Sequence, residues 1–202
     1  MLEKPISNEL VDLLADGADL AVELAEGLPV IGQAVKAAKL YRSVRDALFV
    51  KQVQNFLREL DKVPQETRNA FVQKLYENDE AQRFGAAVTL LLSQLDNLEK
   101  STIIGRLYAA AILGKIEQYE AERVSVMVSR MYIDDRHFLE MLSEESYIAE
   151  DTIHSTLAAI GLLKVVHVQQ STFYQGNTEG ARYKLSGFGE ILLKNGLVDV
   201  AM

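Results

Sequence analysis

Apolar side chains recur every three or four positions over the first 132 residues, which is the spacing of amphipathic helices. Residues 8–26 follow a predicted N-cap at Ser7 and form the first such segment. Pro29 then begins a second predicted helix, which ends near residue 48 or continues to residue 60. Because the connection between the two helices is short, we expect an antiparallel helical hairpin within residues 1–60.

The same spacing continues to residue 132 and is interrupted only by short breaks. Pro64 marks the start of one helix, and Asn78 or Asp79 is the predicted N-cap of the next. Four residues of the helix between them are expected to face inward: Phe71, Val72, Leu75 and Tyr76. A later stripe that is typical of a core consists of Val124, Met127, Val128 and Met131. We therefore predict six or seven helices, packed antiparallel, with the largely apolar segment 98–115 at the centre.

The pattern changes from helical to alternating after residue 162. Two helices are predicted before this point, at residues 134–146 and 151–162, and Gly161 is expected close to the end of the second. Residues 165–170 then alternate between two faces, and the turn-forming sequence QGNTEG leads to a second strand and a final helix. The predicted fold class is thus mainly α: an antiparallel helical bundle over residues 1–132, followed over residues 133–202 by a module with a small β-hairpin.

Two motifs in this module resemble those of bacterial winged-helix domains. LAAIGLL, from residue 157, resembles the end of a recognition helix, and YKLSGFGEILL, from residue 183, resembles the exit from the wing. The resemblance covers residues 133–197, whereas residues 1–132 show no resemblance of this kind. It implies a winged-helix-like module in which the helix of residues 151–162 enters a DNA major groove and the wing of residues 170–180 touches the backbone.

The charges of this module depart from what a DNA-binding protein needs. No Lys or Arg occurs between Arg136 and Lys164, so the predicted recognition helix has no permanent cation. Residues 150–202 contain five acids and four bases, a net charge of −1, and the whole chain has a net charge of −8. Phosphate binding depends on Lys and Arg. We therefore predict a protein partner, or a second copy of the chain in a homodimer, and keep a DNA-binding transcriptional regulator as the alternative.

Six residues of the module are candidates for contact with that partner. Three lie at expected outward positions of the helix, namely Thr152, His154 and Ser155, and Arg182 lies in the second strand. Phe173 and Tyr174 lie in the wing, where exposed aromatic side chains would be natural interface anchors. The alternative for these two aromatics is that they pack on the bundle.

The N-terminal hairpin separates its charges. Residues 1–27 contain seven acids and one base, whereas residues 28–51 contain five bases and one acid. The bases include a stripe with a three-residue step, which consists of Lys36, Lys39, Arg42 and Arg45. Either the acidic and basic stripes lie side by side as solvated faces, or the basic stripe contacts an acidic partner or a membrane surface. The second alternative would make the chain a membrane-active effector if the partner is a lipid.

The sequence contains no recognisable catalytic or metal-binding motif. Cysteine is absent, there are three histidines without metal-ligand spacing, and the Gly-containing segments lack the Lys and Ser or Thr of a phosphate loop. The N-terminus does not resemble a signal peptide, and the longest apolar stretches are shorter than the ~20 residues that span a bilayer. We therefore expect a soluble cytoplasmic protein that is not an enzyme and needs no cofactor or metal.

Overall fold

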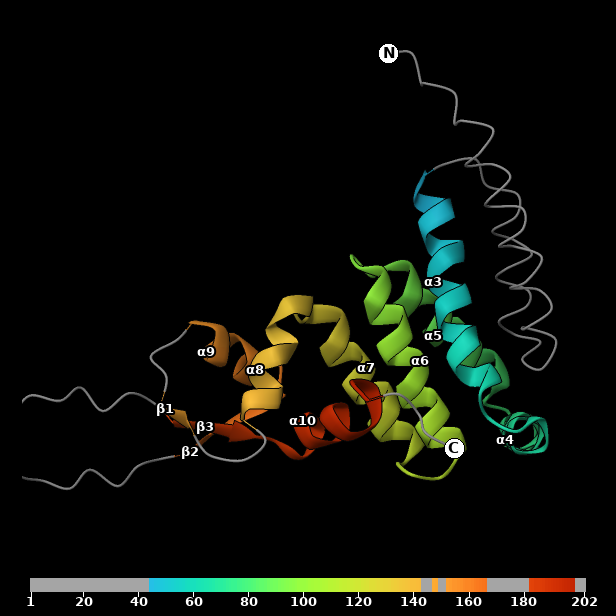
Figure 1. The fold of residues 1–202 in the computed structure, drawn as a ribbon. Coiled ribbons are helices and arrows are strands. Elements are labelled where there is room, and N and C mark those ends of the chain that lie inside the picture. Colours follow the sequence, from blue (N-terminus) through green and yellow to red (C-terminus); the bar gives the residue numbers. More distant parts are fainter. Residues whose placement is uncertain (1–43, 143–146, 149–151, 167–181, 199–202) are drawn as a thin grey trace, which may run out of the picture.

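The computed structural model describes residues 44–142, 147–148, 152–166 and 182–198, and the fold there is mainly helical (Figure 1). The helices before the sheet are α3 (Val44–Asp61), α4 (Gln65–Glu77), α5 (Ala81–Ser93), α6 (Leu98–Ile112), α7 (Gln118–Arg130), the 3-10 turn η1 (Ile133–Asp135) and α8 (Arg136–Met141). The C-terminal elements are β1 (Tyr147–Ile148), α9 (Thr152–Ala159), β2 (Leu163–Val166), β3 (Arg182–Leu185), α10 (Gly187–Ile191) and the π-helical turn η2 (Leu192–Gly196). The prediction of a mainly α fold with a small antiparallel sheet is confirmed. Of the predicted N-terminal hairpin, only the end of the second helix lies within the described residues, as α3.

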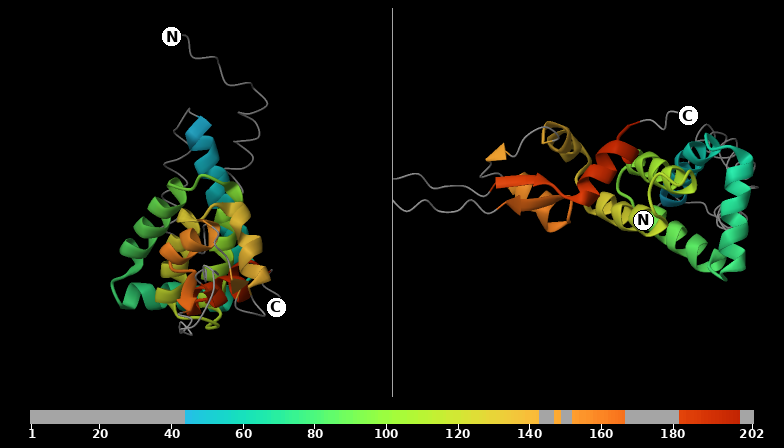
Figure 2. Two further views of the ribbon diagram at one scale, coloured as in Figure 1. Left: turned by 90° about the vertical axis from the view of Figure 1, so that its left-hand side faces the viewer. Right: turned by 90° about the horizontal axis from the view of Figure 1, so that it is seen from below.

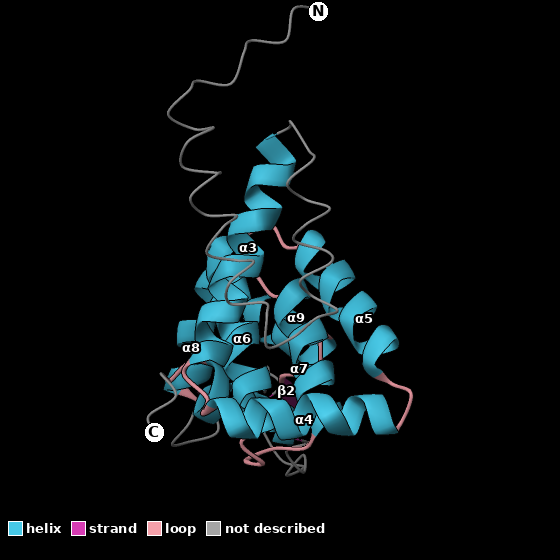
Figure 3. Ribbon diagram, turned by 90° about the vertical axis from the view of Figure 1, so that its right-hand side faces the viewer, coloured by secondary structure: helices cyan, strands magenta, loops and turns pink. Residues whose placement is uncertain are grey.

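Helix α6 is the centre of the bundle, as its apolar composition predicts. Ten of its fifteen residues are buried, and it packs chiefly against α3 and α7. The contact with α3 is close at Gly105, where an added Cβ would lie 2.8 Å from the carbonyl oxygen of Phe56. Only glycine therefore allows the two backbones to approach this far. Helix α4 crosses the foot of the bundle below α5 and α6 (Figure 3).

Aromatic side chains fill the space between α3, α5 and α6. The Tyr108 ring meets the rings of Phe56 and Phe84 edge-on, with centroids 5.6 and 5.5 Å apart, and Phe84 meets Phe71 in the same way. Such edge-to-face pairs add to the stabilisation that burial alone gives. Burial, assisted by the charge of Glu122, also raises the pKa of the Tyr108 hydroxyl above its ordinary value.

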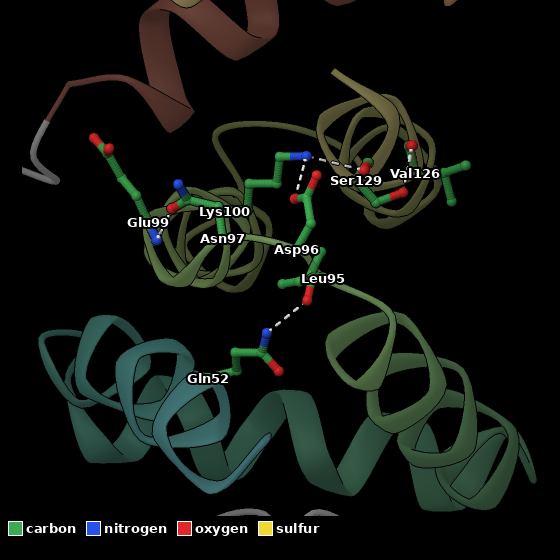
Figure 4. A network of polar contacts seen from close by, with 8 residues as sticks. All are labelled: Gln52, Leu95, Asp96, Asn97, Glu99, Lys100, Val126 and Ser129. Atoms are coloured by element: carbon green, nitrogen blue, oxygen red, sulfur yellow. Dashed lines mark hydrogen bonds and ion pairs between the residues drawn. The ribbon is translucent and has the colours of Figure 1, made fainter. Parts of the chain in front are cut away.

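A buried lysine joins the start of α6 to the end of α7 (Figure 4). Lys100 is 1% exposed, and its Nζ donates to the carbonyl oxygen of Ser129 at 3.1 Å and lies 2.7 Å from Oδ1 of Asp96. The carbonyl of Ser129 belongs to the last turn of α7, where the helix leaves such oxygens without intrahelical donors. The ammonium group therefore caps α7 and is neutralised by an aspartate that remains largely in water.

The C-terminal elements return to the bundle. Helix α10 packs on α7, and η2 packs on α6. The guanidinium group of Arg123 lies over the ring of Phe188, 5.7 Å from its centroid. Most buried apolar side chains of the described residues form one continuous cluster from α3 to η2, which includes Leu157 and Leu162. The C-terminal elements are thus held against the preceding helices by a shared core.

Most of the predicted core positions are confirmed, and two local predictions are wrong. Val124, Val128 and Met131 are buried, and Met127 packs against the core. Tyr76 was expected inward but is 55% exposed.

Asp79 does not cap the start of α5. It adopts a left-handed conformation with φ 58° and ends α4, because the amide nitrogens of Asp79 and Glu80 donate to the carbonyls of Tyr76 and Leu75. Asn78 likewise lies at the C-terminal cap of α4.

A buried hydroxyl in α7 offers a test of this packing. Ser125 is fully buried, and its Oγ has no hydrogen-bond partner within the described residues. An unsatisfied buried polar group costs ~1–3 kcal/mol. We expect Ser125→Ala to increase the free energy of unfolding, measured by urea denaturation, by about 1 kcal/mol.

The matched control is Ser129→Ala in the same helix. The Ser129 hydroxyl donates to the carbonyl of Val126 at 2.8 Å, so its removal brings only the small gain in helix propensity. Equal effects of the two substitutions would contradict the assigned cost of the Ser125 hydroxyl.

Candidate functional site

The end of α9 directs the chain into the hairpin. Gly161 has φ +94°, a conformation that favours glycine, and it closes the helix together with Leu162. The amide nitrogen of Gly161 donates to the carbonyl of Ala158, and that of Leu162 donates to the carbonyl of Leu157. The predicted helix end at Gly161 is therefore confirmed.

Ser186 fastens the exit of the hairpin to this turn. Its amide nitrogen donates to the carbonyl of Leu162 at 3.0 Å, and its Oγ donates to the carbonyl of Gly161 at 2.6 Å. The same Oγ accepts a hydrogen bond from the amide nitrogen of Gly189 and so caps α10. The two motifs LAAIGLL and YKLSGFGEILL, which are separated in sequence, are thus joined directly by hydrogen bonds.

The outward face of α9 carries hydroxyl groups and no permanent charge. Thr152, Ser155 and Thr156 are exposed. The hydroxyls of Ser155 and Thr156 both donate to the carbonyl of Thr152 at 2.8 Å. In this arrangement their protons are used within the helix, and their lone pairs remain available to donors from a partner. Two of the predicted contact residues, Thr152 and Ser155, therefore lie together on an accessible surface.

His154 does not belong to this face, contrary to the outward position expected from the sequence. It is 5% exposed, and its ring lies 5.5 Å from the ring of Phe138 and 5.8 Å from the stacked ring of Tyr183. Position 154 precedes the fully buried Leu157 by three residues, which places both on the core side of the helix. That spacing is the signal in the sequence that identifies His154 as a core residue.

The register of the sheet gathers three cations on one face of the hairpin. The strand order is β1-β3-β2, and β2 pairs antiparallel with β3 so that Leu163 lies opposite Leu185 and Lys164 opposite Lys184. Arg182 lies opposite Val166 on the same face as the two lysines. Both lysines are exposed, Arg182 is partly exposed, and none of the three has an ion-pair partner within the described residues. We call Lys164, Arg182 and Lys184 the cationic face.

The net charge of the sequence does not indicate the cationic face. Residues 150–202 have a negative net charge, yet the strand register brings bases from two segments together. The alternation of Lys164 with the buried Leu163, and of Lys184 with the buried Leu185, is the pattern that would have found it.

The remaining predicted site residues fall largely outside the described residues. Phe173 and Tyr174 of the predicted wing lie there, as do Lys36, Lys39 and Arg42 of the basic stripe. Arg45, the last residue of that stripe, is exposed at the start of α3.

Two other types of site are not found where the structure can be described. The described residues contain no group of three or more acidic or histidine side chains arranged to hold a metal ion. Among the same residues, no helix combines the length and apolar character needed to cross a bilayer.

Comparison with known proteins gives no family. No protein-family model matches the chain, and no curated protein or solved structure matches it significantly. The function therefore has to be inferred from the chemistry of the α9 surface and the hairpin.

Two glycines of α10 test the junction on which this surface depends. An added Cβ at Gly189 would lie 2.2 Å from the carbonyl oxygen of Leu162, whereas at Gly187 it would have no neighbour within 4 Å. We expect Gly189→Ala to lower the free energy of unfolding by about 1–3 kcal/mol, because the turn must move away from α10. Chemical denaturation measures the change.

Gly187→Ala in the same helix is the control, and it should leave stability unchanged or raise it by up to about 1 kcal/mol. If the two variants showed the same stability, the close approach of α10 to the turn after α9 would be refuted.

Proposed function

We propose that this chain is a non-enzymatic protein-interaction module, which binds its partner through the outward face of α9. The neutral hydroxyl-bearing surface of Thr152, Ser155 and Thr156 carries this proposal. The centres of protein interfaces are depleted in charged residues, whereas DNA-reading helices rely on Arg and Lys for guanine and phosphate. The outward face of α9 is likewise free of charged side chains, and it has no Arg or Lys with which to bind guanine or phosphate.

We further propose that residues 133–197 form a winged-helix-like module. The motif resemblance supports this proposal, and so does the direct bonding of the two motifs through Ser186. The order of helix, hairpin and helix, with β1 added beside β3, agrees with such an arrangement. In this proposal α9 takes the position of the recognition helix and presents a protein-binding surface.

A DNA-binding regulator is the second candidate, and the cationic face is the observation that favours it. Lys164, Arg182 and Lys184 could contact a phosphate backbone if the hairpin acted as a wing. The neutral α9 surface offers little with which to read bases, so this mode would be weak and independent of DNA sequence. Membrane binding through the basic stripe depends on residues that are outside the described part, apart from Arg45, and it stays a prediction.

Site-specific photocrosslinking in cells tests protein docking on α9. We expect a photoreactive phenylalanine analogue at Ser155 to give a discrete covalent adduct with another protein, because that position faces the partner. The same analogue at Ala86, an exposed position of α5, is the control and should give no such adduct.

A fluorescently labelled random-sequence duplex provides the opposing test. At 50 mM salt we expect weak binding that is lost by 200 mM, as electrostatic contacts to a few phosphates would give. Tight binding that resists salt, together with the absence of an adduct specific to Ser155, would reverse the choice between protein and DNA.

A further inference from the structure

Among the strands that the structure describes, β2 lies at an edge of the sheet. The order β1-β3-β2 leaves β3 in the middle, and β2 contacts chiefly β3 and α9 (Figure 2). In an antiparallel pair, every second residue directs its N–H and C=O away from the neighbouring strand. Among the described residues, no hydrogen bond outside the ladder involves the backbone of residues 163–166. The outer side of β2 therefore offers backbone donors and acceptors to another strand.

The two faces of this edge differ in chemistry. Lys164 lies on the cationic face, directly opposite Lys184, and both side chains are exposed. Val165 lies on the other face, opposite the buried Tyr183, and is itself 47% exposed. Facing lysines repel each other across a strand pair, and a half-exposed valine at the rim of a core leaves apolar surface in water. One neighbouring strand with acidic and apolar side chains would reduce the repulsion between the lysines and cover the exposed surface of Val165.

We propose that the outer edge of β2 binds an extended acidic segment of the partner protein as an additional strand. Backbone hydrogen bonds would join the two strands, as in other cases of strand addition. Acidic residues at alternate positions of the added strand would lie on the cationic face directly beside Lys164, with Lys184 one strand further away on the same face. The intervening apolar residues would lie beside Val165. The partner segment is thus expected to alternate acidic and apolar side chains.

Repulsion between lysines disfavours the binding of a second copy of the chain at this edge. Pairing β2 with β2 of another copy would place the lysine pairs of both copies on one continuous sheet face. Four like charges would then lie within a few residues of one another, which is destabilising. An acidic strand instead places a carboxylate opposite Lys164, at a distance of ~5 Å between the facing Cβ atoms.

A nucleic acid could bind the cationic face through its phosphates, but it could not pair with the backbone of the β2 edge. A phosphate backbone cannot continue the alternating N–H and C=O ladder, and it brings no apolar side chain to Val165. Lysines on an edge strand also serve to discourage unwanted pairing, and the experiment has to separate that role from binding.

A short peptide tests this inference, which rests on the proposed protein-interaction function. The probe is a labelled Gly-Glu-Val-Glu-Val-Glu-Ser peptide, and its control has the same composition with the three Glu and two Val in separate blocks. We expect the full chain to bind the alternating peptide about tenfold more tightly than the block peptide, measured by fluorescence polarisation.

Matched charge variants assign the binding to the hairpin. We expect K164Q/K184Q to weaken peptide binding about tenfold, because the cation beside the carboxylates and the cation one strand further away on the same face are both lost. R58Q/K74Q removes two cations from exposed positions of α3 and α4 and should leave binding unchanged. Circular dichroism and thermal unfolding establish that both variants are folded, as expected for substitutions of exposed side chains.

Hydrogen exchange distinguishes strand addition from charge attraction alone. The amides of residues 163–166 that point outward should exchange more slowly in the presence of the peptide. Any of four results would overturn the inference. These are equal binding of the two peptides, peptide binding without slower amide exchange in β2, preferential binding of a labelled DNA duplex, and dimerisation through this edge. Because the Ser155 crosslink does not depend on β2, an adduct at Ser155 together with any of these results would leave the proposed function standing and reject only the strand addition.

Discussion

The hydrogen bonds of Ser186 to the turn after α9 are the interaction on which the C-terminal surface depends. They hold the end of β3 against the beginning of β2 and so fix the register in which Leu163 faces Leu185. A shift of one residue would exchange the two faces of a strand. The observed register buries the leucines and places Lys164 and Lys184 side by side in water. Which side chains the hairpin exposes therefore depends on the hydrogen bonds of Ser186.

The bundle holds this surface in place. Helix α10, which Ser186 caps, packs on α7, and η2 packs on the central helix α6. The same apolar cluster runs from α3 through α6 to β2 and β3, so the hairpin is attached through a packed core. The buried Lys100 adds a polar link between α6 and α7. A surface supported in this way is suited to binding without a large change of shape, which reduces the entropy that association must overcome.

The sequence predicted the helices well because most of them carry apolar residues at helical spacing, and it located Gly161 because a helix end needs a left-handed residue. It failed where the outcome depends on partners distant in the chain. The two residues of β1 have no pattern of their own and are ordered by pairing with β3. Lys100 is buried only because Ser129 and Asp96 meet it. His154 was assigned by its polarity, although its spacing from Leu157 places it in the core. The cationic face required the strand register, which a sum of charges does not contain.

The register of β2 and β3 is the central claim, and nuclear magnetic resonance of the isotopically labelled chain measures it most directly. We expect backbone nuclear Overhauser effects that pair Lys164 with Lys184 and Val166 with Arg182 as directly opposite residues. Effects that instead place Lys164 opposite Tyr183 or Leu185 would contradict it, because the lysines would then no longer share a face with each other.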